Sequence, residues 1–212
     1  MAVTAIIGHG RSAEGRKWGP RIDRCNMVVR MWDWHWQSAD DYGSRYDVGL
    51  FEISNGLIDR FRQYNRRRPA RCWIASFLWR LSREYAPPGR VEIVDQRRWT
   101  EIGVQQFGGA GTRDKLQFTR GTIAACWAIE AAAVGDTVML IGFDNVLAAK
   151  ALPIEEGFSK VYRAEPSTFH FDGYAEGETR YGNHDFTVEL PVMRFLAAHR
   201  GINLVFAQQE WA

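Results

Sequence analysis

One stretch in the second half of the chain, residues 119–144, constrains the fold more than any other. A small polar turn at residues 119–122 leads into an alanine-rich segment at residues 124–134, and a Gly-Asp break precedes the apolar run 137–141. The first segment is apolar nearly all round, which is typical of a helix packed between a sheet and neighbouring elements. The apolar run is typical of a strand covered on both faces. The stretch therefore predicts a helix followed by a buried strand.

Strand-like and helix-like patterns alternate along the whole chain. Strands are expected at residues 3–7, 25–31, 46–51, 71–75, 91–94 and 202–206, and helices at residues 55–64, 77–85 and 187–199. This alternation predicts an α/β fold with a mostly parallel sheet covered by helices. Residues 145–183 show little periodicity, which is typical of a lid or binding loop. A length of 212 residues predicts a single domain, 1–212, with an irregular lid at about 145–183.

Composition excludes several classes of protein. The hydrophobic fraction of 46% and the charged fraction of 25% are ordinary for a globular protein, and a net charge of +2 is too small to indicate nucleic-acid binding by itself. Cys25, Cys72 and Cys126 are odd in number and lie in apolar runs, so they are interpreted as buried reduced thiols.

The sequence has no HExxH motif, no clustered Cys/His set and no D-x-D pair, so it predicts no metal site. It has no signal peptide or membrane span, which favours a cytoplasmic protein without a membrane partner.

Two of the predicted strands end in glycine. The first strand leads into Gly8, His9 and Gly10, and the strand at 137–141 leads into Gly142. Ligands of open α/β sheets bind beyond the carboxyl ends of strands, where glycine lets a phosphate approach the backbone. The turn at 119–122 begins a helix, whose free N–H groups attract anions. These segments are candidates for one binding site; the alternative is a core helix and strand without a site.

The sharpest chemical cluster comes near the end of the chain. His184 stands just before the predicted helix 187–199, and Glu189 follows in its first turn. A histidine at the positive end of a helix tends to stay neutral and can accept a proton. Pro191 is expected within the first turn, where proline is tolerated. The alternative is that His184 caps the helix and that Glu189 interacts only with the helix dipole.

Three groups of short motifs follow one another along the chain. The first combines the glycine loop at residues 6–12 with G-x-x-I-D at 19–23, V-V-R at 28–30 and G-S-R at 43–45; the second combines T-R-G-T at 119–122 with G-F at 142–143; the third is H-x4-E at 184–189. In this order they resemble the large, small and very small sialylmotifs of the eukaryotic-type sialyltransferases, glycosyltransferase family 29. The resemblance covers roughly residues 5–52 and 117–200.

The resemblance implies a single Rossmann-like domain of the variant GT-A type. It also implies inverting transfer of a sugar from a nucleotide-sugar to an acceptor hydroxyl, without a metal ion or another cofactor. His184 is then the general base, and His170, in place of the short third motif, donates to the leaving nucleotide phosphate. The implied donor-binding residues are Gly8, His9, Gly10, Arg30, Thr119, Gly121, Thr122 and Gly142. Asp185, Glu189 and Tyr181 are the supporting residues, and Tyr181 is the alternative to His170 for the third motif.

The chain departs from the family pattern at positions that matter for the donor. His9 and Trp32 each stand where the family has an asparagine, so the sequence does not name the donor, CMP-sialic acid included. Ala5 and either Val134 or Gly135 stand where secreted members carry bridging cysteines. These departures suggest a compact bacterial or phage-type relative that works in reducing cytosol.

Two other functions remain open from the sequence. One is a phage-type glycosyltransferase that acts on hydroxymethylated DNA bases, which the arginines within residues 60–71 and the nine tryptophans would suit. The other is a nucleotide-binding module without catalytic activity. The acceptor, whether a glycan, a nucleic-acid base or a small molecule, and the oligomeric state are not determined by the sequence.

Overall fold

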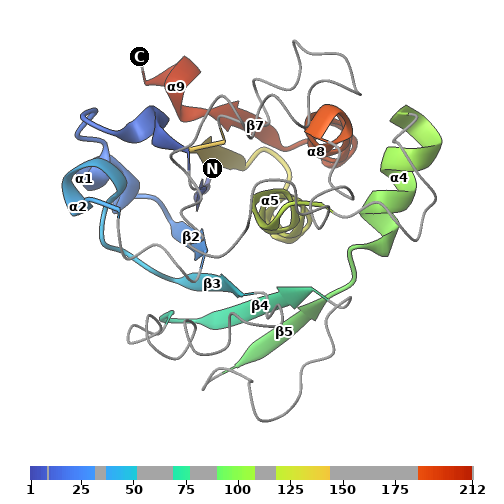
Figure 1. Cartoon of the computed structure of the whole chain (residues 1–212), viewed down its shortest axis with the longest axis horizontal. Coiled ribbons are helices and arrows are strands. Elements are labelled where there is room, and N and C mark those ends of the chain that lie inside the picture. The colour runs from blue at the N-terminus through green and yellow to red at the C-terminus, as the bar shows by residue number, and fades with distance from the viewer. Residues whose placement is uncertain are drawn as a thin grey trace, which may run out of the picture.

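A computed structural model describes residues 1–8, 10–31, 37–51, 69–76, 90–107, 118–143 and 186–211 (Figure 1). Its strands are β1 (Val3–Ile7), β2 (Met27–Met31), β3 (Val48–Phe51), β4 (Cys72–Ser76), β5 (Val91–Val94), β6 (Thr137–Ile141) and β7 (Asn203–Phe206). Its helices are α1 (Gly19–Ile22), α2 (Ala39–Tyr42), α4 (Arg97–Phe107), α5 (Arg120–Ala131), α8 (Phe186–Arg200), α9 (Ala207–Glu210) and the short 3₁₀ helix η1 (Arg11–Ala13).

The described strands form one seven-stranded sheet in the order β5-β4-β3-β2-β1-β6-β7, and every neighbouring pair is parallel. The chain steps outward from β1 to β5 and then returns to place β6 on the other side of β1. Ile7 of β1 therefore lies between Arg30 of β2 and Ile141 of β6. This order makes the β1–β6 pair the topological switch point of the sheet. The predicted Rossmann-like α/β fold with a parallel sheet is confirmed.

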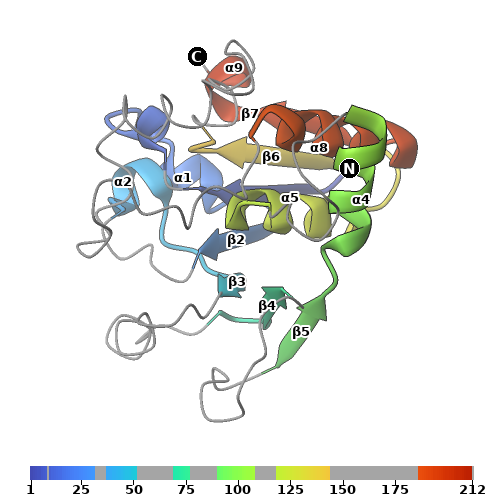
Figure 2. The same cartoon turned by 45° about the vertical axis from the view of Figure 1, so that its right-hand side comes forward.

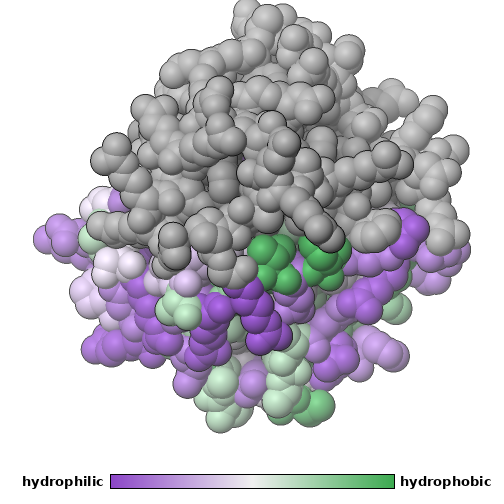
Figure 3. Space-filling model, turned by 90° about the horizontal axis from the view of Figure 1, so that it is seen from below, coloured by the Kyte–Doolittle hydropathy of each residue, from purple (hydrophilic) through white to green (hydrophobic). Residues whose placement is uncertain are grey.

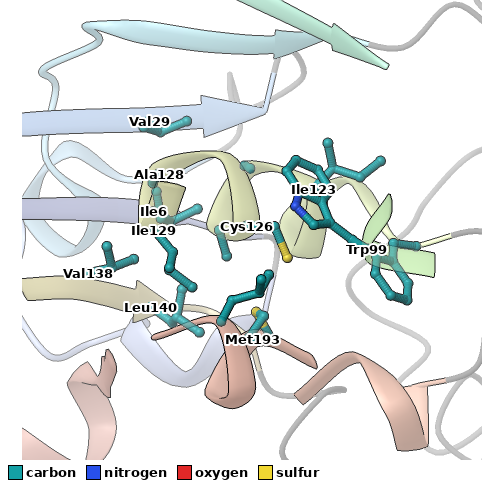
Figure 4. Close-up of a cluster of buried hydrophobic side chains, with 14 of the residues drawn as sticks. Ile6, Val29, Trp99, Ile123, Cys126, Ala128, Ile129, Val138, Leu140 and Met193 are labelled. Atoms are coloured by element: carbon teal, nitrogen blue, oxygen red, sulfur yellow. The ribbon is translucent and has the colours of Figure 1, made fainter. Parts of the chain in front are cut away.

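Helices cover both faces of the sheet (Figures 1 and 2). Helices α4, α5 and α8 cover one face, where their side chains join Ile6 and Leu140 in one apolar cluster, and α1, α2 and α9 cover the other, where they meet Ile7 and Ile141. Figure 4 shows the first cluster, with side chains of β1, β2 and β6 directed toward α5 and Met193 of α8 beside them. The alternation along β1 and β6 places successive apolar residues on opposite faces, and both faces are buried.

The element boundaries agree closely with the sequence pattern for several elements. β5 occupies the predicted residues 91–94, β6 the predicted 137–141, and α8 extends the predicted helix by one residue at each end. Helices α4 and α2 were not predicted. The helices expected at 55–64 and 77–85 and the lid expected at about 145–183 lie outside the described residues.

Pro191 does not lie in the first turn of α8, so that expectation was wrong. The helix begins at Phe186, which makes Pro191 its sixth residue, inside the second turn. At this position proline has no N–H to donate to the carbonyl four residues earlier, and one intrahelical hydrogen bond is missing. Val188, Leu190, Val192 and Met193 are nevertheless buried, so packing of α8 against the sheet and α5 offsets this loss.

The described surface seen from the side of β4 and β5 is mostly hydrophilic, with apolar side chains in small groups (Figure 3). Among the described residues, the large apolar side chains that are clearly exposed are Met1, Ile93, Val134 and Phe195. None of the described helices has the length and apolar character that crossing a bilayer requires.

Candidate functional site

The candidate site lies where β1 and β6 end. Beyond their carboxyl ends, the N–H of Gly8 donates to the carbonyl of Ile141 (2.7 Å) and the N–H of Gly10 donates to the carbonyl of Gly142 (2.8 Å). Parallel pairing thus continues past the strands and holds the glycine loop against the end of β6. Both N–H groups are engaged within this edge, so a ligand at the loop has to meet other groups.

Close backbone contact explains the glycines at this edge. Gly142 has φ +70°, and a Cβ atom there would lie 2.9 Å from the carbonyl oxygen of Gly10. A Cβ on Gly8 would overlap the carbonyl oxygen of Gly142, and one on Gly121 would lie 3.0 Å from the ring of Phe143. Only glycine satisfies this crowding without displacing backbone. The structure therefore brings together the predicted residues Gly8, Gly10, Gly121 and Gly142.

The amino end of α5 reaches the same edge. Helices that connect parallel strands run opposite to them, and in Figure 2 α5 begins on the side toward which the arrowheads of β2 and β6 point. Thr119 is the N-cap of α5, and its hydroxyl accepts a hydrogen bond from the N–H of Thr122 (3.4 Å). The N–H of Gly121 lies in the first turn, where a helix has no internal acceptor to offer.

Glu189 of α8 holds this end of α5. Its carboxylate, which is fully buried, accepts hydrogen bonds from the N–H of Thr119 (2.8 Å), from the hydroxyl of Thr119 (2.7 Å) and from the hydroxyl of Thr122. A carboxylate placed against a helix N-terminus is stabilised by the helix dipole, and three donors compensate its burial. We call this arrangement the α5–α8 clasp. Glu189 was predicted to lie in the first turn of its own helix and to be a supporting residue of the site. The structure shows that it binds the first turn of a second helix, α5.

The clasp changes what the two threonines can offer a ligand. Both hydroxyls are hydrogen-bonded to Glu189, and the hydroxyl of Thr119 also lies 3.1 Å from that of Thr122, so the two threonines fix the helix end. The carboxylate also affects its surroundings. Burial, and secondarily the charge of Glu189, raise the pKa of the Cys126 thiol well above its usual value, with Arg98 opposing.

Arg30 lies beneath the glycine loop. Its side chain is fully buried and donates to the backbone carbonyls of Arg45 (2.7 Å) and Tyr42 (2.5 Å) and to Oε1 of Gln37 (3.2 Å). Gln37 in turn donates to the carbonyl of Gly8 (2.7 Å), and the hydroxyl of Tyr42 donates to that of Gly10 (2.9 Å). Arg30 therefore acts on the loop through two other residues, Gln37 and Tyr42.

Gln37 and Tyr42 are functional candidates that the sequence did not identify. Gln37 follows a tryptophan-rich stretch of sequence at 32–36 and belongs to none of the three motif groups, so nothing in the sequence distinguishes it. Tyr42 adjoins the G-S-R step, which gave a weak signal. Phe143 was part of a quoted motif, and it contacts both Gly8 and Gly121 across the site.

Other residues of the large motif hold the chain together some distance from the loop. Asp23 accepts from the N–H groups of Ser44 (2.9 Å) and Arg45 (2.8 Å), and the guanidinium of Arg45 pairs with Asp47 (2.8 Å). A Cβ on Gly43, which has φ +74°, would overlap Asp23. The I-D and G-S-R steps therefore join the segment before β2 to the segment before β3.

Several predicted site residues lie outside the described residues: His9, His170, Tyr181, His184 and Asp185. Within the described ranges, no group of three or more His, Cys, Asp or Glu side chains is arranged to hold a metal ion.

Among the comparisons with known proteins, the comparison with solved structures gives matches. No family model matches the chain, and no curated protein matches it by sequence. The structure of a mammalian sialyltransferase in complex with Gal-beta-1-3GalNAc-ortho-nitrophenol aligns with a TM-score of 0.50 and 17% identity, over 96% of this chain and 68% of that chain. Another structure of a mammalian sialyltransferase aligns over the same shares with a TM-score of 0.49 and 17% identity. Together with the parallel sheet and its helical layers, the alignment shows that this chain has a sialyltransferase-like fold.

Proposed function

We propose that the chain is a metal-independent, inverting glycosyltransferase that moves a sugar from a nucleotide-sugar to an acceptor hydroxyl, with His184 as the general base. The observation that carries this proposal is the α5–α8 clasp. It joins the amino ends of two helices at the carboxyl edge of the sheet, beside the β1–β6 switch point. At the first of these ends Glu189 occupies the N-cap groups and leaves the N–H of Gly121 for a donor, and the second end follows directly on the candidate base.

The donor would bind across the glycine loop, Gly142 and the first turn of α5. Sheets of this topology bind nucleotides at the switch point, and helix N-termini favour phosphate. Because the hydroxyls of Thr119 and Thr122 are engaged with Glu189, we assign the N–H of Gly121 as the group of this turn that contacts the donor. The two threonines act by fixing its position.

Covalent connectivity supports the role of His184. It precedes the first residue of α8 by two positions, and a chain extends by at most about 3.6 Å per residue, which keeps it within about 7 Å of the start of that helix. Glu189, in the first turn of α8, touches the first turn of α5. Chain length is therefore compatible with the proposed base acting at the proposed donor site. The positive end of α8 would favour the neutral imidazole that a base requires.

The proposed reaction is a single displacement. His184 takes the proton of the acceptor hydroxyl as its oxygen forms a bond to the anomeric carbon, and the bond from that carbon to the nucleotide phosphate breaks on the opposite side. His170 donates to the leaving phosphate, where negative charge develops. The absence of a D-x-D pair supports a mechanism without a metal ion, and we expect activity to persist in EDTA.

The proposed substrate class follows from the fold and the motifs together. The structurally similar mammalian sialyltransferase was solved with a disaccharide derivative, and we propose by analogy a glycan acceptor and a CMP-sialic-acid-like donor. Thermal-shift measurements with CMP-, UDP-, GDP- and dTDP-sugars test the donor. A ligand at 100 times its Kd adds about 2.7 kcal/mol of stability. If no nucleotide-sugar stabilises the protein, the proposed function is wrong.

Substitution of the base tests catalysis separately from binding. We expect His184→Ala to lower the transfer rate by about 10²–10⁴-fold and to leave donor affinity within about twofold. His199→Ala is the matched control, because His199 is an exposed histidine at the other end of α8. Equal transfer by wild type and His184→Ala would remove the catalytic assignment. Transfer to hydroxymethylated DNA but not to oligosaccharides would favour the nucleic-acid acceptor instead.

A further inference from the structure

We propose that Gln37 and Tyr42 are positioning residues for the donor. Gln37 binds the carbonyl of Gly8 and Tyr42 binds the carbonyl of Gly10. The buried Arg30 binds both Gln37 and Tyr42. This inference rests on the proposed function, since it assigns how that function's donor loop acquires its shape. It concerns two residues that lie outside the glycine motif and, in the case of Gln37, outside every motif of the sequence.

The first support is the burial of the two side chains. Gln37 is 7% exposed and Tyr42 is 1% exposed. A buried side-chain amide costs free energy unless its polar atoms are bonded. Gln37 meets this requirement in both directions, since its Oε1 accepts from Arg30 and its Nε2 donates to Gly8. Its orientation is therefore set by the arginine on one side and by the loop on the other.

The second support is the position of the two acceptors. Gln37 holds the carbonyl of Gly8 (2.7 Å) and Tyr42 holds the carbonyl of Gly10 (2.9 Å). The N–H groups of the same two glycines bind β6. Each of these glycines is thus held through both of its polar backbone groups, one by the neighbouring strand and one by a side chain.

Peptide geometry turns this anchoring into a consequence for the ligand. A trans peptide directs its N–H opposite to its C=O. Fixing the carbonyl of Gly10 toward Tyr42 therefore also fixes the direction of the N–H of Arg11, which belongs to the same peptide. Glycine has wide conformational freedom, and a loop of glycines without these bonds would lose that freedom only on binding. Holding the loop beforehand removes this ordering cost from the free energy of binding.

Arg30 explains why the two anchors act together. Its guanidinium donates to Gln37 and to the backbone of Tyr42, and its Nε donates to the carbonyl of Arg45. The fork of an arginine presents its donors in a fixed plane, so the two anchors keep a constant separation. Because Arg30 binds Gln37 and the backbone of Tyr42, it acts on the donor through these two anchors.

Tyr42→Phe tests the proposal with the smallest change. It removes only the hydroxyl that donates to Gly10, while the ring and the backbone carbonyl that binds Arg30 remain. Tyr46→Phe is the matched control, because Tyr46 is 8% exposed and precedes β3 at the amino end of the sheet. Gln37→Met is the second variant: it keeps the length of the side chain and removes both the donor to Gly8 and the acceptor of Arg30. The probe is whichever of CMP, UDP, GDP and dTDP binds the wild type, measured by calorimetry.

We expect Tyr42→Phe and Gln37→Met each to raise the Kd of that nucleotide about tenfold, which corresponds to about 1.4 kcal/mol, whereas Tyr46→Phe changes it less than twofold. Turnover at saturating donor should fall less than threefold, so the effect appears in KM and not in kcat. If wild type binds a nucleotide and Tyr42→Phe binds it equally well, the inference is overturned and the proposed function stands. If wild type binds none of the four, both are overturned.

Discussion

A single buried carboxylate connects two parts of the chain that are 70 residues apart. Glu189 accepts hydrogen bonds from both Thr119 and Thr122, and through them it fixes the beginning of α5 against the beginning of α8. The sequence places Glu189 five residues after the candidate base, but it gives no indication of the partner helix. The contact exists because both helices precede strands of the same half of the sheet, so their amino ends meet at one edge.

Replacement of this carboxylate should weaken the fold measurably. We expect Glu189→Gln to lower the free energy of unfolding by about 2–3 kcal/mol, because hydrogen bonds to a charged group are lost and a buried amide faces donors. Urea unfolding measures the change. Glu210→Gln, at an exposed residue of α9, is the control and should change stability by less than about 0.5 kcal/mol. Equal stability of the two variants would contradict the clasp.

The three thiols should differ in reactivity. Burial raises the pKa of Cys25, of Cys72 and, most strongly, of Cys126, and all three are free. Cys72 is only half-buried, so we expect a thiol reagent to modify it first and to reach Cys126 only after unfolding. Because these pKa values are higher in the folded state, the unfolded state ionises first as pH rises. The free energy of unfolding should therefore fall above the ordinary thiol pKa. Peptide mass spectrometry after brief labelling checks the order, and early labelling of Cys126 would contradict it.

At the scale of elements, the end of β6 is where the fold is most sensitive to small changes. Strand and loop approach so closely here that Gly142 adopts φ +70° and leaves no room for a side chain. The sequence predicted the strand and the glycine that follows it. It did not predict that Gly8 and Gly10 would use their N–H groups to bind β6, because that depends on which strand neighbours β1.

Two glycine variants separate crowding from backbone strain. Gly142 and Gly135 both have positive φ, but a Cβ on Gly135 would meet nothing within 4 Å. Gly135→Ala should therefore lower the free energy of unfolding only by the cost of a positive φ for alanine, about 1–2 kcal/mol. Gly142→Ala should lose more stability than this and should also weaken nucleotide binding. Thermal unfolding and nucleotide titration measure both. If the two variants behaved alike, contact between the loop and β6 would not be important.

Much of the element plan could be predicted, and the failures have physical causes. The buried strand β6 is an apolar run from Val138 to Ile141, and its pattern needs no knowledge of neighbours. Helix α4 was missed because its apolar residues are few: Trp99 is buried and bonded to Glu130 of α5 (2.9 Å), a contact that tertiary packing creates. Pro191 was misplaced because helix ends are poorly marked in sequence: α8 begins at Phe186, one residue before the predicted start.

At the scale of the whole molecule, the last residues of the chain pack onto its first third. Trp211 meets the edge of Trp18 at 5.5 Å between ring centroids, and Arg21 lies 4.2 Å above the ring of Trp211. Helix α9 thereby covers the face of the sheet that carries α1. This contact joins the segment that follows the edge strand β7 to the segment that follows the glycine loop.

Loss of this contact should affect stability without removing the fold. We expect Trp211→Ala to lower the free energy of unfolding by about 1–3 kcal/mol, from the lost ring pair and cation–π contact, and to lower Tm by several degrees. Trp211→Phe should keep most of both contacts and is the control. Calorimetric unfolding measures the difference. A Tm unchanged in Trp211→Ala would show that the C-terminal residues do not stabilise the domain.

The sequence by itself determined the class of fold, since apolar runs that alternate with helical patterns can bury their surfaces only in a layered α/β sheet. The sequence also shows which loops carry glycine. At Gly8 and Gly142 the crowded backbone leaves no room for another residue. Only the tertiary structure decided which side chains work together. Pairing of β2 with β1 brought Gln37 and Tyr42, which follow β2, to the glycine loop that follows β1. Packing of α8 against α5 brought Glu189 to Thr119. These contacts join residues far apart in the chain, and burial, which makes unpaired polar groups costly, selects them.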